Sequence, residues 1–197
     1  DFTTALDTYG LIRYWDVSLI TDMSNLFQNK TDFNDDISSW DVSGVTNMIA
    51  MFMNTDFNQD ISSWDVSSVT NMNEMFRNAD SFNGDLSSWD VSGVTNMSGM
   101  FYSATSFNGD ISDWDVSAVT HMGNMFSGAT NFDQDLNSWD VSGVASMSSM
   151  FHGAESFNQD LSSWDVSSVT YMTDMFFGSN ALSDGAKCAI HTAFSSN

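Results

Sequence analysis

The stretch Ser62-Ser63-Trp64-Asp65-Val66-Ser67 contains the Trp-Asp-Val triplet that decides the fold of this chain. The triplet occurs seven times in 197 residues, and successive copies lie 24 or 25 residues apart. A fixed period of this length is typical of repeat proteins, in which each repeat packs only against its neighbours. The seven triplets begin at Trp15, Trp40, Trp64, Trp89, Trp114, Trp139 and Trp164.

Within each repeat the spacing of the apolar residues changes. Trp64 and Val66 lie two positions apart, which is the spacing of a short β-strand that turns Asp65 to its other face. Later in the repeat, as in residues 97–104, apolar residues follow at i, i+3, i+4 and i+7, which indicates a helix. A threonine two positions before this stripe is expected to be the N-cap, and Ala145 in its place predicts a helix start weaker by about 1 kcal/mol.

The sequence therefore predicts an α/β solenoid with one short parallel strand and one short helix in each repeat of about 25 residues, over about seven repeats. Residues 1–14 are expected to form an N-terminal cap, with a short helix opening at Thr3–Leu6, and residues 15–182 the solenoid. Residues 183–197 are expected to form a C-terminal capping helix, with Cys188 as a small buried hydrophobe.

A longer consensus surrounds the triplet: Phe-Asn-x-Asp-Ile/Leu-Ser-Ser-Trp-Asp-Val-Ser-x-Val-Thr-x-Met-x-x-Met-Phe, over about residues 11–182. It resembles the BspA-like leucine-rich repeats, a bacterial surface-protein repeat of similar length also known as DUF285. The resemblance implies a leucine-rich-repeat-like solenoid on a secreted or surface-exposed protein. Members of the BspA-like group are associated with adhesion to host proteins and other cells, but the resemblance supplies no fixed ligand residues.

The charge of the chain restricts its partners. The formal net charge is −22, from 26 acidic and 4 basic residues, which argues against binding to nucleic acid or docking on anionic lipid. Low lysine content with much Ser, Asn and Asp is typical of extracellular or cell-surface proteins. Three histidines at non-equivalent positions, a single cysteine and no Gly-rich phosphate loop give no catalytic arrangement, so we expect no enzyme.

One aspartate and one serine per repeat are expected to point outward from the predicted sheet, with successive carboxylates about 5 Å apart. Like charges at that distance repel by roughly 0.8 kcal/mol in water. Three explanations remain open: bound Ca²⁺, hydrogen bonds to the serine two positions later, or tolerance by water and salt. The predicted binding face comprises Asp41, Asp65, Asp90, Asp115, Asp140, Asp165, Ser43, Ser67, Ser92, Ser117, Ser142 and Ser167, and the candidate metal ligands are Asp65, Asp90, Asp115 and Asp140.

Two further positions recur with polar residues. An aspartate before Ile or Leu, with Ser at plus two, predicts an Asx turn in which the carboxylate accepts backbone N–H bonds. An asparagine after the repeat phenylalanine predicts a stacked side-chain ladder that satisfies loop backbone. These positions are Asp36, Asp60, Asp85, Asp110, Asp135 and Asp160, and Asn34, Asn58, Asn83, Asn108, Asp133 and Asn158.

These patterns favour a non-enzymatic binding or adhesion module that uses the acidic, Ser-rich face. The expected partner is a protein, a glycan or another copy of the chain, bound through that face or through the solenoid ends. A Ca²⁺-dependent structural or self-assembling surface protein is the alternative, and binding to ice or a mineral surface is a third. No cofactor other than Ca²⁺ is suggested.

Overall fold

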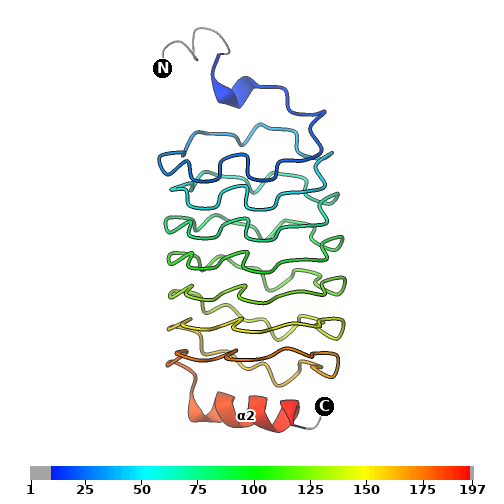
Figure 1. Cartoon of the computed structure of the whole chain (residues 1–197), viewed down its shortest axis with the longest axis vertical. Coiled ribbons are helices and arrows are strands. Elements are labelled where there is room, and N and C mark those ends of the chain that lie inside the picture. Colours follow the sequence, from blue (N-terminus) through cyan, green and yellow to red (C-terminus); the bar gives the residue numbers. More distant parts are fainter. Residues whose placement is uncertain (1–9, 196–197) are drawn as a thin grey trace.

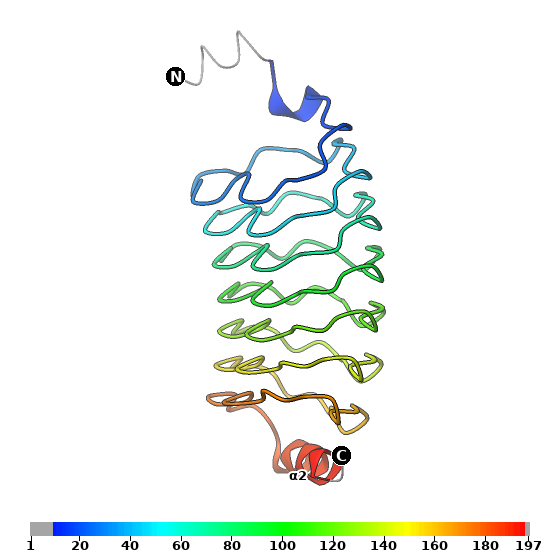
Figure 2. The same cartoon turned by 45° about the vertical axis from the view of Figure 1, so that its right-hand side comes forward.

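The computed structural model describes residues 10–195, which fold into a stack of coils, one coil for each repeat (Figure 1). Figure 2 shows the same stack from the side, with α2 beneath its last coil. The two helical elements among these residues are the 3-10 helix η1, Ile12–Tyr14, and the α-helix α2, Asp184–Phe194. The predicted helix at Thr3–Leu6 lies outside the described residues.

The prediction of an α/β solenoid with a strand and a helix in every repeat is wrong. Among residues 10–195 there is no extended strand, no sheet and no helix inside the repeats. Neighbouring coils are joined instead by single parallel bridges, one per coil. The bridges link, in order, Asp22, Asn47, Asn71, Asn96, His121, Ser146 and Tyr171.

Each coil is a series of tight turns rather than a strand and a helix. In residues 61–64, 66–69 and 72–75, the N–H of the last residue donates to the carbonyl of the first, at 2.9 to 3.2 Å. The first and last residues of each turn are apolar and buried, whereas the two between them are polar. A turn thus places positions i and i+3 on the inside, as a helix would, and this shared spacing explains the wrong prediction.

The segment taken for a helix also contains left-handed residues. Glu74 and Asn78 have φ of +56° and +55°, which a right-handed α-helix excludes. Alternate amides of residues 72–78 donate to carbonyls of the next coil, at 2.7 to 3.0 Å, and make no i to i−4 bonds. The hydrogen bonds of this segment therefore hold the coils together along the stack.

The threonine before this segment is not an N-cap. Thr70 Oγ1 donates to the carbonyl of Thr46 in the preceding coil at 3.2 Å, and the Thr70 N–H donates to the same oxygen at 2.9 Å. Ala145 lacks the hydroxyl bond but keeps the backbone bond, to Thr120 at 2.9 Å. There is no helix start at Ala145 to weaken.

One apolar core runs along the whole stack. Phe101 shows its packing: its ring centroid lies 3.8 Å from that of Phe107 in the same coil. The centroids of Phe76 and Phe126, in the coils on either side, are 5.7 and 5.8 Å away. Stacked rings of this kind link each coil to both neighbours, so the core is continuous although no coil has a core of its own.

Helix α2 lies against the C-terminal end of the stack (Figure 1). Ser183 is its N-cap and accepts the N–H of Ala186 at 3.1 Å, and Ile190 is its one buried residue. Cys188 is exposed, so the prediction that it is buried is wrong. It lies two positions from Ile190, which places it on another side of the helix. No helix within residues 10–195 has the length and apolar character needed to cross a lipid bilayer.

Candidate functional site: the aspartate columns

The aspartate that follows each tryptophan forms an exposed column along the stack, which we call the first aspartate column. Asp65 Oδ1 accepts the N–H of Ser67 at 3.1 Å and its Oγ–H at 2.7 Å. The same two bonds recur in every coil up to Asp140, and Asp165 keeps the N–H bond. The column comprises Asp16, Asp41, Asp65, Asp90, Asp115, Asp140 and Asp165.

The aspartates of this column face solvent as predicted, but turns rather than strands carry them. Trp64 and Val66 are buried and Asp65 is exposed, as the sequence predicts. However, the surface carrying Asp65 is built from turns, because no sheet exists among the described residues. The predicted binding residues therefore lie along the outside of consecutive turns.

Hydrogen bonds from serine lower the pKa of aspartates in the column, as at Asp65 and Asp41. The side-chain bond from Ser67, followed by its backbone bond, holds the pKa of Asp65 below the ordinary value of 3.8. At Asp41 the same two bonds from Ser43 lower the pKa, and repulsion from Asp16 and Asp65 is the smaller, opposing effect. The bonds to serine, one of the three explanations for the repeated aspartate, are present in the structure.

A second aspartate column precedes the buried Ile or Leu and forms the predicted Asx turns. Asp60 Oδ1 accepts the Ser62 N–H at 3.0 Å and its Oγ–H at 2.7 Å, which lowers the pKa of Asp60. Every member of the column accepts at least the backbone N–H two positions later. At the N-terminal end of the column, Asp36 also forms an ion pair with Arg13 at 3.5 Å.

The predicted asparagine ladder is also present. Asn58 Oδ1 accepts the N–H of Asn83, one coil later, at 2.9 Å. The pattern continues through Asp133 and ends where Asn158 accepts the N–H of Ser183, the N-cap of α2. These bonds align successive coils, so they fix the register of the aspartates beside them.

Two inter-coil contacts escaped the sequence analysis. Each tryptophan indole from Trp40 to Trp164 donates to a backbone carbonyl in the preceding coil or segment, at 2.9 to 3.2 Å. Five threonines at the repeat position of Thr70 donate their hydroxyls to the equivalent carbonyl one coil earlier. A fixed Thr or Trp at one repeat position was the only signal, and it did not reveal the acceptor.

A metal centre gains no support from the geometry. No group of three or more His, Cys, Asp or Glu side chains in residues 10–195 is placed to hold an ion. The candidate set Asp65, Asp90, Asp115 and Asp140 therefore remains a prediction. Of the histidines, His121 is exposed, and its Nδ1 lies 2.8 Å from Thr120 Oγ1.

A family model described as "Mycoplasma protein of unknown function, DUF285" matches residues 2–95 and again residues 84–187. The chain belongs to the DUF285 family. This confirms the resemblance drawn from the consensus. DUF285 is a repeat-type family without an assigned activity, so membership supplies no catalytic or ligand residues. No curated protein and no solved structure matches this DUF285 chain.

Proposed function

We propose that this chain is a non-enzymatic binding module of the cell surface or extracellular space, and that its first aspartate column binds a basic protein partner. The observation that carries the proposal is the fixed carboxylate of each coil. From Asp41 to Asp140 each Oδ1 is held by two serine bonds, as in Asp65 with Ser67. The other carboxylate oxygen, Oδ2, of each exposed aspartate can then accept hydrogen bonds from a partner.

Such a surface suits a partner rich in Lys or Arg. The carboxylates are already oriented, so binding costs less side-chain entropy than it would with mobile acids. A net charge of −22 attracts cationic partners over distance and raises their association rate, and salt weakens this attraction. The low-lysine surface supports an extracellular or cell-surface location as part of the same proposal.

The test compares two sets of four neutralising substitutions. The first replaces Asp65, Asp90, Asp115 and Asp140 with Asn, whose side-chain carbonyl can still accept both serine bonds. The control removes four exposed acids outside the aspartate columns, by Asp32→Asn, Asp56→Asn, Asp80→Asn and Glu155→Gln. Both variants have a formal net charge of −18 (−22 + 4), so they differ in where charge is lost. Binding of a decalysine peptide is measured by calorimetry at several salt concentrations.

We expect the column variant to lose most of the peptide affinity and the control to keep most of it. Equal loss in both variants would show attraction to net charge alone and would overturn the assignment to the column. Calcium is examined in the same variants by thermal unfolding. A melting temperature that rises with millimolar Ca²⁺, and does so only when the column is intact, would favour the calcium-dependent alternative over the basic partner.

A further inference from the structure

The backbone hydrogen bonds give the stack a direction. In four positions of each coil, the N–H points toward the C-terminal end and donates to a carbonyl of the next coil, as Phe126 donates to Met150 at 2.9 Å. In a fifth position the bond runs the other way, as Thr120 N–H donates to Thr95 at 2.9 Å. The last coil therefore ends in four amides and one carbonyl that have no partner within residues 10–195. They are the N–H groups of Met172, Asp174, Phe176 and Gly178 and the carbonyl of Thr170.

The first coil ends in the complementary set. Four carbonyls and one amide at its open side have no hydrogen-bond partner among the described residues. They are the carbonyls of Asp22, Ser24, Leu26 and Gln28 and the N–H of Thr21. Their spacing along the chain matches that of the five groups on the last coil, because both sets are copies of one repeat. The two ends can therefore form the same five bonds that join every internal pair of coils.

Apolar exposure is also confined to the two ends. Leu26 is 46% exposed, whereas Met51, at the same repeat position one coil later, is fully buried. At the other end, Phe176 is partly exposed although the equivalent Phe151 is fully buried. All large exposed hydrophobic side chains among the described residues lie before the second coil or within the last one. They are Leu11, Tyr14, Trp15, Leu19, Ile20, Leu26, Tyr171 and Phe177.

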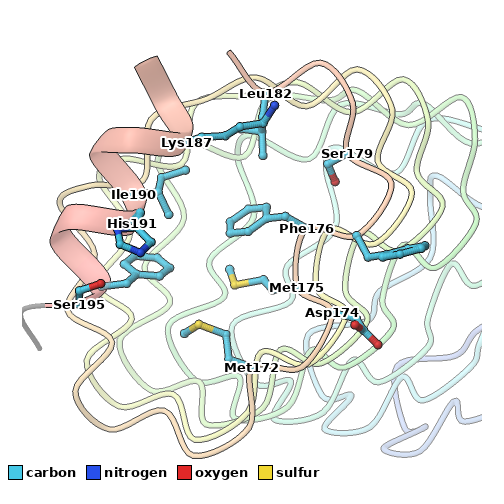
Figure 3. A pocket seen from close by; sticks show the side chains of 12 residues that line it. Met172, Asp174, Met175, Phe176, Ser179, Leu182, Lys187, Ile190, His191 and Ser195 are labelled. Atoms are coloured by element: carbon cyan, nitrogen blue, oxygen red, sulfur yellow. The ribbon is translucent and has the colours of Figure 1, made fainter. Parts of the chain in front are cut away.

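Helix α2 covers only part of the C-terminal end. Figure 3 shows Ile190 pointing from the helix toward an open space, with Met172, Met175 and Phe176 on the coil side. This cavity has a volume of about 550 Å³. Trp164 and Val166 remain buried in the last coil, whereas Met172 loses the complete burial of its equivalents.

The helix is held to the coils by few contacts. Its side-chain hydrogen bond from Thr192 and its ion pair between Lys187 and Asp184 both stay inside the helix. The N-cap residue Ser183 is tied to the stack through one bond, to Asn158. Ile190 is buried in the apolar core, and Ala186 and Phe194 also pack against that core. A second copy stacked in register would add its first coil at the end of the stack where α2 now lies, so the helix has to move aside.

We propose that two copies of this chain bind head to tail, with residues 21–28 of one copy pairing with residues 170–178 of its partner copy after α2 has been displaced. Helix α2 thereby acts as a cap that limits growth of the stack. Because the contact uses different surfaces on the two copies, it can repeat and form linear chains. Repulsion between two copies of charge −22 opposes it, so added salt strengthens this contact, whereas salt weakens binding of a basic peptide.

The register can be tested with cysteines. Thr21 and Thr170 are exposed ends of the threonine column, and consecutive members of that column are joined backbone to backbone. Single variants T21C and T170C are made with C188S, which removes the exposed native thiol. We expect disulfide dimers on oxidation of the mixture and far fewer in either sample alone. T46C mixed with T120C, from inner coils of the same column, is the control and should give none.

Several outcomes would overturn the proposal. Dimers in T21C or T170C alone, at the yield of the mixture, would show that like ends meet. No dimer in the mixture, together with a concentration-independent mass of the unmodified chain in sedimentation equilibrium at high salt, would show that the ends do not bind.

The role of α2 is tested in the same mixture. Ile190→Asp removes the buried contact of the helix, whereas Cys188→Asp, made in place of C188S, puts the same charge at an exposed helix position. We expect the first to raise the yield of mixed disulfide about tenfold, because a lost apolar contact makes displacement easier, and the second to leave it unchanged. Equal yields from the two variants would overturn the role of α2 as the cap.

Discussion

The indole of Trp89 donates a 3.1 Å hydrogen bond to the carbonyl of Ile61, which lies in the preceding coil and also accepts the N–H of Trp64. The bond is buried, and its equivalents recur along the stack. Each tryptophan is therefore both an apolar core residue and a polar link between coils. This double role accounts for a tryptophan at a position where Leu or Phe could supply the packing alone.

Trp89→Phe should lower the stability of the chain by about 1–3 kcal/mol. Phenylalanine keeps an aromatic ring in the core but loses the hydrogen bond and part of the packing. Urea unfolding followed by circular dichroism gives the change. Ser88→Ala is the matched control, since Ser88 Oγ donates to the Ser62 carbonyl at 2.7 Å at an exposed site. A Ser88→Ala cost as large as that of Trp89→Phe would contradict the importance of burial.

The stability of the chain should fall as the pH drops below 3.8. Eleven aspartates have folded-state pKa values lowered from 3.8 by bonds to their neighbouring residues. Their contribution is fully present above 3.8 and is lost as the pH falls through the lowered folded-state values. Melting temperatures between pH 6 and pH 2 measure it.

The matching control for this pH dependence replaces Asp41, Asp65, Asp115 and Asp140 with Asn. The side-chain amides do not titrate in this range, so the loss of melting temperature between pH 4 and pH 2 should be smaller than in the natural chain. An unchanged acid response would show that these carboxylates do not contribute to it.

Gly99→Ala should destabilise the stack by about 1–2 kcal/mol. Gly99 has φ of +63°, where any side chain is strained, and an added Cβ would lie 3.3 Å from Glu74 Cγ in the coil before. Gly143→Ala is the control, because Gly143 has no positive φ and its Cβ would meet nothing closer than 3.5 Å. Thermal unfolding of the two variants should separate them, and equal stability would refute the left-handed constraint.

Phe101→Ala should cost about 3–5 kcal/mol, because it removes a fully buried ring that contacts the coils on both sides. Phe177→Ala, at a ring that is 68% exposed, should cost far less. Denaturant unfolding gives both values. A small loss for Phe101→Ala would mean that the neighbouring rings collapse into the space, so the stacked core would be less rigid than the geometry indicates.

Much of the repeat could be predicted from the sequence, because the types of residue and their spacing decide it. The 24- or 25-residue period, the inward Trp and Val, and the Asx turns at Asp60 all follow from residue types at fixed spacing. The register of the asparagine ladder follows likewise. The α2 segment has the helical pattern that the sequence predicts there.

The helix inside each repeat could not be excluded by apolar spacing, because a chain of turns buries i and i+3 as a helix does. The left-handed backbone was the missing information. One repeat position is Asn29, Asn54 and Asn78 in early coils and Gly128 and Gly153 in later ones. Exchange of Asn with Gly is a signal for positive φ. The position four residues earlier also has positive φ. It holds Ala50, Glu74 and Ser149 as well as Asn25, Gly99, Asn124 and Asp174, so residue type gives a weaker signal there.

The direction shared by four backbone positions in each coil has an electrical consequence. Peptide groups aligned in one sense add their dipoles from coil to coil, as they do in a helix. The threonine position, and the amides of Asp56, Ser106 and Ser156 that also donate to the preceding coil, subtract from the sum. The stack therefore has a permanent dipole along its axis, with the partial positive pole at the coil beside α2. A chain with an excess of 22 negative charges thus has one end whose backbone favours anions.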